Sequence, residues 1–109
     1  MLEKRTRDFG VRIIRLSASL PNTPEGREIR RQITKSGTSV GANYREANRA
    51  RSKADFRSKI RICEGETSET HYWLEMIIEV GWLSEEEVKF ELKECGELLA
   101  IFTSINKKY

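Results

Sequence analysis

Residues 56–81 read FRSKIRICEGETSETHYWLEMIIEVG, and apolar or small residues recur along this stretch at alternating intervals of four and three. The positions in this series are Phe56, Ile60, Cys63, Thr67, Thr70, Leu74, Ile77 and Gly81. Such spacing keeps one side of an α-helix turned toward its neighbours in a helical bundle. A second apolar line widens that side, so we expect this helix to touch more than one neighbour. That line consists of Ile62, Trp73, Met76 and Val80.

Capping residues flank the stretch on both sides. Ser52, followed three residues later by Asp55, is typical of a helix start, and Gly81 is typical of a helix end. Ser84 and Glu87 form a capping box that predicts a further helix reaching about Asn106. Its apolar positions form two lines: Val88, Leu92, Cys95, Leu99 and Phe102, and then Leu98, Ile101 and Ile105.

The first half of the chain predicts two more helices. One runs from about Glu3 to Ser19 until Pro21 ends it, and the other begins at Pro24 behind the capping residue Thr23 and runs to about Ala50. Their apolar positions are Phe9, Ile13, Leu16 and Leu20, and then Ile29, Ile33, Val40, Tyr44 and Ala47.

The middle of the second helix, residues 36–43 (SGTSVGAN), is poor in helix-forming residues. Tertiary contacts must therefore stabilise it. Its small residues would let another helix approach closely, and Ser39 or Asn43 could form a hydrogen bond across the contact.

These patterns predict an all-α fold, an up-down-up-down antiparallel four-helix bundle in which residues 1–109 form one domain. Hydrophobic residues make up 38% of the chain and charged residues 34%, which suits helices with large solvated sides. The mean hydropathy is −0.61, and no apolar run approaches the roughly 18 residues of a membrane span. The charged N-terminus does not resemble a secretory signal, so we expect a cytoplasmic protein without a membrane partner.

Residue counts argue against catalysis. His71 is the only histidine, and Ser68 stands where a di-iron Glu-x-x-His pair would require a glutamate. Cys63 and Cys95 are too far apart for a local zinc chelate, and both fall on apolar helical positions, so we interpret them as reduced core thiols. No phosphate-binding glycine loop is present. Glu66 and Glu69 indicate a solvated or salt-bridged helix side. We therefore expect no enzyme, no metal and no cofactor.

The formal net charge of +3 hides a strong asymmetry. Residues 27–61 hold eleven bases and three acids, whereas residues 62–97 hold two bases and eleven acids. Either these two halves face each other across helices or subunits, or the basic half forms a surface for polyanions.

The placement of the bases favours a polyanion surface. Four arginines of the second helix lie within roughly 40° of one another, opposite its apolar side, and three bases of the third helix follow at four-residue spacing. The candidate nucleic-acid-binding residues are Arg27, Arg31, Arg45, Arg49, Lys53, Arg57 and Arg61. Only Glu28 and Glu46 supply carboxylates between residues 27 and 50. The sequence contains no recognisable module that reads nucleobases, so such binding would tolerate any nucleic-acid sequence and depend steeply on salt.

Two signatures, together with the turn at Leu20 and Pro21, resemble the four-helix-bundle family of proteins encoded in intervening sequences of bacterial 23S ribosomal RNA genes. They are Gln32, Ser39, Asn43 and Glu46, and then Gly65, Glu69 and Leu74. The resemblance implies an up-down bundle, a homopentamer and no known enzymatic activity. A related bundle, the accessory protein of diversity-generating retroelements, is pentameric, and its basic surface engages a reverse transcriptase and nucleic acid.

Three hypotheses follow. The first is a non-catalytic oligomer that binds the RNA or DNA backbone through the seven basic side chains named above. The second is a protein-interaction scaffold whose arginines pair with the acidic half of a neighbouring subunit. The third, a metal-dependent or hydrolytic enzyme, has the least support.

Overall fold

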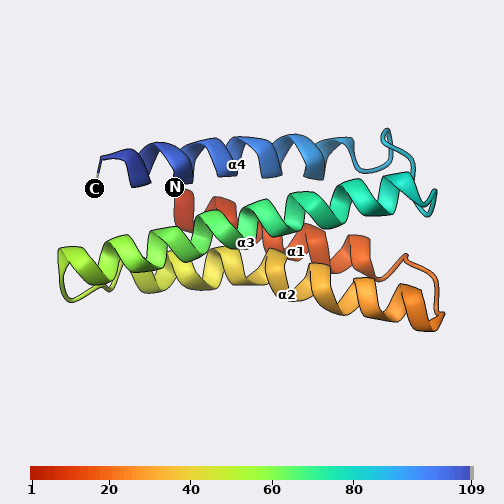
Figure 1. Cartoon of the computed structure of the whole chain (residues 1–109), viewed down its shortest axis with the longest axis horizontal. Coiled ribbons are helices and arrows are strands. Elements are labelled where there is room, and N and C mark those ends of the chain that lie inside the picture. Colours follow the sequence, from red (N-terminus) through yellow and green to blue (C-terminus); the bar gives the residue numbers. More distant parts are fainter. Residues whose placement is uncertain (109) are drawn as a thin grey trace.

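The computed structural model describes residues 1–108, which form four α-helices and no strand. The helices are α1 (Leu2–Ser17), α2 (Pro24–Ala47), α3 (Lys53–Glu79) and α4 (Lys89–Lys107). The chain turns back after each of the first three, so that consecutive helices run in opposite directions (Figure 1). α2 packs against α1 and α3, α3 packs against α4, and the contact between α1 and α4 is the lightest of these pairings. These pairings are compatible with an up-down bundle.

The core consists mainly of residues from the predicted apolar lines, but Ile62 and Val80 of the second α3 line are exposed, and Leu99 and Ile101 of α4 are only half-buried. All four positions of α1 and its following turn are buried, as are six of the eight positions of the α3 series. The two exceptions lie at the ends of α3, where Phe56 is half-buried and Gly81 is exposed.

Three predicted caps are confirmed. The Thr23 hydroxyl accepts a hydrogen bond from the Gly26 N–H at 3.0 Å, and the Ser52 hydroxyl accepts one from the Asp55 N–H at 3.0 Å. Gly81 adopts a φ of 81°, which a glycine reaches without strain. Its N–H and that of Trp82 bond to the carbonyls of Ile78 and Ile77, and these bonds close the end of α3.

Two predicted helix ends are wrong by a few residues. α1 ends at Ser17 instead of Ser19, and α2 ends at Ala47 instead of Ala50. In both places the second and third N–H groups after the helix bond to carbonyls three residues back, which tightens the chain into a turn. Arg49 therefore lies in the turn after α2.

The predicted capping box before α4 forms, but regular helix starts later than expected. The Ser84 N–H donates to Glu87 Oε1 at 2.8 Å, and the Glu87 N–H donates to the Ser84 hydroxyl at 3.1 Å. Residues 85–88 still form turns, and α4 begins at Lys89.

The close helix approach predicted for residues 36–43 is confirmed between α1 and α2. A methyl group on Gly37 would lie 2.7 Å from Ile13 Cγ2, and one on Gly41 would lie 3.2 Å from the backbone of Thr6. The expected hydrogen bond across it is wrong, because Asn43 donates to the Ser39 carbonyl of its own helix.

A buried pair of hydroxyls forms a hydrogen bond between α2 and α3. Thr70 of α3 donates to the Ser36 hydroxyl of α2 at 2.8 Å. Ser36 is buried at the helix contact, whereas Ser39 and Asn43 are only half-buried.

Cys63 and Cys95 are free and buried, as predicted. The Cys63 thiol lies 3.6 Å from the Val40 carbonyl and the Cys95 thiol lies 3.2 Å from the Thr67 carbonyl, and burial raises the pKa of each thiol to about 12. Separately, none of the helices in residues 1–108 has the length and apolar character needed to cross a bilayer.

Candidate nucleic-acid interface

Six of the seven predicted cations are exposed. They are Arg27, Arg31, Arg45, Arg49, Lys53 and Arg61. Arg57 is half-buried, and its Nε atom is buried without a hydrogen-bond partner among the described residues. Six guanidinium or ammonium groups are therefore accessible to an outside anion.

Most of these cations lack a partner within the described part of the chain. Arg31 pairs with Glu28 at 2.8 Å, and Arg27 donates to the Asn22 side chain at 3.1 Å. The side chains of the other four exposed bases form no ion pair or hydrogen bond with residues 1–108: Arg45, Arg49, Lys53 and Arg61.

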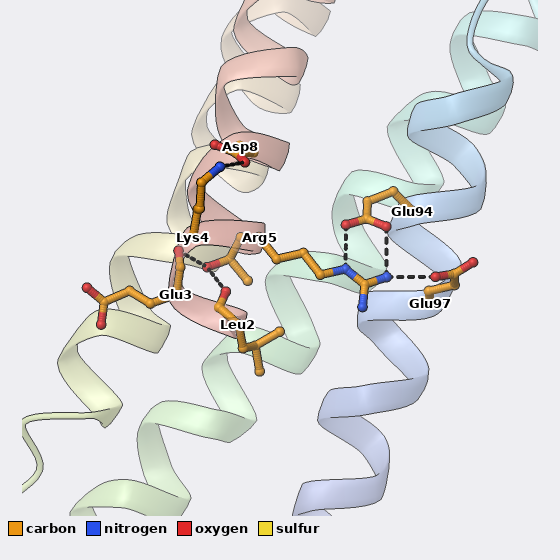
Figure 2. Close-up of polar contacts among 8 residues, drawn as sticks. Leu2, Glu3, Lys4, Arg5, Asp8, Glu94 and Glu97 are labelled. Carbon is orange, nitrogen blue, oxygen red and sulfur yellow. Dashed lines mark hydrogen bonds and ion pairs between the residues drawn. The ribbon is translucent and has the colours of Figure 1, made fainter.

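The acidic half of the chain is not joined to the basic half by ion pairs within residues 1–108, although the charge of Lys35 acts on Glu66. No ion pair among residues 1–108 joins a base of residues 27–61 to an acid of residues 62–97. The acids of α4 pair instead with α1, where Arg5 contacts Glu94 and Glu97 and Arg12 contacts Glu91 (Figure 2 shows the Arg5 contacts). Within one chain, the two halves thus do not face each other in ion pairs.

The seven cations form two basic lines, which lie on different sides of the α2–α3 pair. The α2 line is Arg27, Arg31, Arg45 and Arg49, and the α3 line is Lys53, Arg57 and Arg61. The α2 line includes Arg45, which borders a groove between α2 and α1. At about 100° per residue, the α3 line lies within roughly 60° of Glu64. Glu64 accepts hydrogen bonds from Thr103 and Asn106 of α4. The α2 line is therefore on the side toward α1, and the α3 line is on the side toward α4.

Arg7 of α1 is a cation that the sequence analysis missed. It is exposed and borders the same groove as Arg45. Its position in the sequence gives no signal, because only the packing of α1 on α2 brings the two arginines to one groove.

The residues considered for catalysis do not form a metal site within residues 1–108. Among residues 1–108, no group of three or more His, Cys, Asp and Glu side chains is placed to hold a metal ion. His71 Nδ1 lies 3.4 Å from Glu75 Oε1 of its own helix. Burial raises the pKa of Glu66, the charge of Glu69 adds to this effect, and Lys35 opposes it.

Fold and site together define a small all-α protein whose candidate site is a charged outer surface. The family model of the 23S rRNA-intervening sequence protein matches residues 2–104, and the chain belongs to that family, as the signatures indicated. A 1.70 Å crystal structure of a protein of unknown function from the S23 ribosomal protein family of Bacteroides thetaiotaomicron is similar. It has 36% sequence identity and a TM-score of 0.90, and the match covers 98% of this chain and 99% of that chain. No curated protein matches the sequence.

Proposed function

We propose that this chain is a non-catalytic, cytoplasmic homo-oligomer of up-down-up-down bundles, a pentamer by family resemblance, that binds the backbone of RNA or DNA. The two basic lines of α2 and α3 supply the contacts. One observation carries the proposal: Arg45, Arg49, Lys53 and Arg61 are without an acidic partner within residues 1–108. Exposed helix cations that the protein does not neutralise are suited to a polyanion.

The residue types favour phosphate. Six of the seven bases are arginine, whose planar guanidinium matches two phosphate oxygens. Cations that contact only phosphates release counterions and read no base edges. The proposed binding is therefore insensitive to sequence and weakens as salt rises.

Binding to a generic RNA, measured by fluorescence anisotropy at two salt concentrations, tests the proposal. We expect binding at low salt, and a large loss in the variant Arg45→Glu/Arg49→Glu. The control Arg15→Glu/Lys93→Glu changes the net charge equally at exposed positions of α1 and α4. Absence of binding at low salt, or equal losses in both variants, would overturn it.

A protein-interaction scaffold without a nucleic-acid role is the second candidate. Large apolar side chains at the surface favour it, since Tyr72 is 52% exposed and Val80 is 53% exposed. In this case Arg45→Glu/Arg49→Glu should lower the oligomer mass in light scattering while RNA binding is absent from the wild type. An unchanged mass counts against the scaffold.

A further inference from the structure

A groove of about 370 Å³ runs between α1 and α2 on the outer surface. Side chains of both helices border it: Arg7, Val11 and Ile14 from α1, and Thr38, Ala42 and Arg45 from α2. Val11 is 40% exposed and Ile14 is 48% exposed, so the groove presents apolar surface to solvent. Such surface beside charged groups is typical of a contact site.

The groove carries net positive charge, because two cations, Arg7 and Arg45, border it together with one carboxylate, Glu3. The Glu3 carboxylate accepts a hydrogen bond from Asn48 at 3.0 Å and forms no ion pair with either arginine. Asp8, next to Arg7 in the sequence, pairs with Lys4 at 2.8 Å. Neither Arg7 nor Arg45 forms an ion pair or a side-chain hydrogen bond with residues 1–108.

A surface of opposite charge lies on α3. At about 100° per residue, five α3 residues fall within roughly 100° of one another on its outer side. They form what we call the acidic ridge: Ile62, Gly65, Glu66, Glu69 and Trp73. Burial and the charge of Glu69 raise the pKa of Glu66, Lys35 of α2 opposes them, and neither carboxylate forms an ion pair with residues 1–108. The acidic ridge would therefore gain from an outside cation.

Gly65 leaves open space on the acidic ridge that a second copy could approach closely. A glycine inside a helix is destabilising, and Gly65 lies in the middle of α3. Apart from the adjoining backbone of its own helix, a methyl group there would meet no atom of residues 1–108 within 4 Å, so the described packing inside the protomer does not require the glycine. A missing side chain at an exposed position lets another backbone approach closely.

We propose that the acidic ridge of one copy docks into the α1–α2 groove of a second copy. Glu66 and Glu69 would approach Arg7, and Ile62 and Trp73 would cover Val11 and Ile14. Both surfaces are amphipathic and their charges are opposite, which fixes the partner and the register of the contact. This inference rests on the homo-oligomer of the proposed function and names its two surfaces.

The geometry of assembly follows from the difference between the two surfaces. Each copy that uses its groove for one neighbour still offers its acidic ridge to another. Such a head-to-tail contact produces a ring when the rotation between copies closes, and a filament when it does not.

Charge reversal tests the contact at two residues outside the proposed nucleic-acid set. Arg7→Glu and Glu69→Arg should each weaken association about a hundredfold, seen as a lower mass in light scattering. The double variant Arg7→Glu/Glu69→Arg restores opposite charges at every contact and should recover the wild-type mass. Arg15→Glu and Glu79→Arg reverse exposed charges elsewhere on α1 and α3, and they should leave the mass unchanged.

Three results would overturn the docking contact: a monomeric wild type, single variants that keep the full mass, or a double variant that stays dissociated although its circular dichroism is native. RNA binding of the same variants, measured separately, distinguishes failure of this contact from failure of the proposed function. If RNA binding persists in a dissociated Arg7→Glu variant, the basic lines act without the oligomer.

Discussion

Arg5 of α1 and Glu94 of α4, 89 residues apart, form a two-pronged ion pair. Arg5 Nε donates to Glu94 Oε2 at 2.7 Å, and Nη2 donates to Oε1 at 2.8 Å (Figure 2). Nη2 also contacts Glu97 at 2.7 Å. The hydrogen bonds that Arg5 donates to Glu94 raise the pKa of Arg5 further above its usual range. Because α1 and α4 share the lightest helix packing in the bundle, this pair fixes a contact that apolar burial supports only weakly.

The substitution Arg5→Met should therefore destabilise the bundle. It leaves Glu94, whose side chain is only 15% exposed, without its partner. We expect a loss of about 1–2 kcal/mol in the free energy of unfolding, after allowing for the solvent exposure of Arg5. Urea denaturation followed by circular dichroism measures it.

Lys4→Met is the matched control, because it removes an ion pair within α1 whose two side chains are largely exposed. It should leave the urea midpoint unchanged. If both variants lose the same stability, the α1–α4 pair has no special role.

The two buried thiols should react slowly in the folded protein. Burial raises the pKa of Cys63 and Cys95 from 9.0 to about 12, which suppresses the reactive thiolate. At pH 8 we expect labelling by a thiol reagent to be at least about a hundredfold slower in the native protein than in denaturant. Rapid native labelling of either thiol would show that the core opens readily.

The same thiols predict a loss of stability at alkaline pH. Their folded-state pKa lies above the unfolded value, so the folded chain retains protons that the unfolded chain releases above pH 9. Their contribution to stability is complete below about pH 9 and declines as the pH rises toward 12. Between pH 8 and pH 10 the wild type should lose about 2–3 kcal/mol more than Cys63→Ala/Cys95→Ala. Equal losses in urea titrations would contradict this prediction.

Much of the fold could be predicted because it depends on local patterns. The spacing along α3 predicted its buried positions. Thr23, Ser52 and Gly81 predicted helix ends, because a capping residue contacts only backbone groups close to it in the sequence. The end of α2 was less predictable, because Asn48–Ala50 can continue a helix or tighten into a turn. Local propensity does not decide between these outcomes.

The candidate site was predictable only in part. Helical spacing gives the direction of each basic line around its own helix, but it does not give the rotation of α2 relative to α3. The separation of the two lines and the meeting of Arg7 with Arg45 depend on contacts between helices. For the same reason the half-burial of Arg57 and the contact between Arg12 and Glu91 could not be predicted from helical spacing.

Two glycine-to-alanine substitutions should have opposite effects on stability. In Gly37→Ala the new methyl group would lie 2.7 Å from Cγ2 of the fully buried Ile13, so we expect a loss of about 1–3 kcal/mol. In Gly96→Ala, apart from the adjoining backbone of α4, the methyl group meets no atom of residues 1–108 within 4 Å, and the variant should gain about 1 kcal/mol from higher helix propensity. Thermal unfolding of both variants measures the difference. Destabilisation by Gly96→Ala would reveal packing around Gly96 from outside the protomer.

The difference in exposure between the cations of the two basic lines predicts unequal effects on the salt dependence of RNA binding. Removing one cation that contacts phosphate lowers the slope of log K against log salt by about 1. Arg45→Gln/Arg49→Gln removes two exposed, unpaired cations and should lower the slope by about 2. Arg57→Gln/Arg61→Gln should lower it by about 1, because Arg57 is half-buried and only Arg61 is exposed. Titrations at four salt concentrations separate these values, and an unchanged slope in both variants would mean that neither line contacts the phosphates.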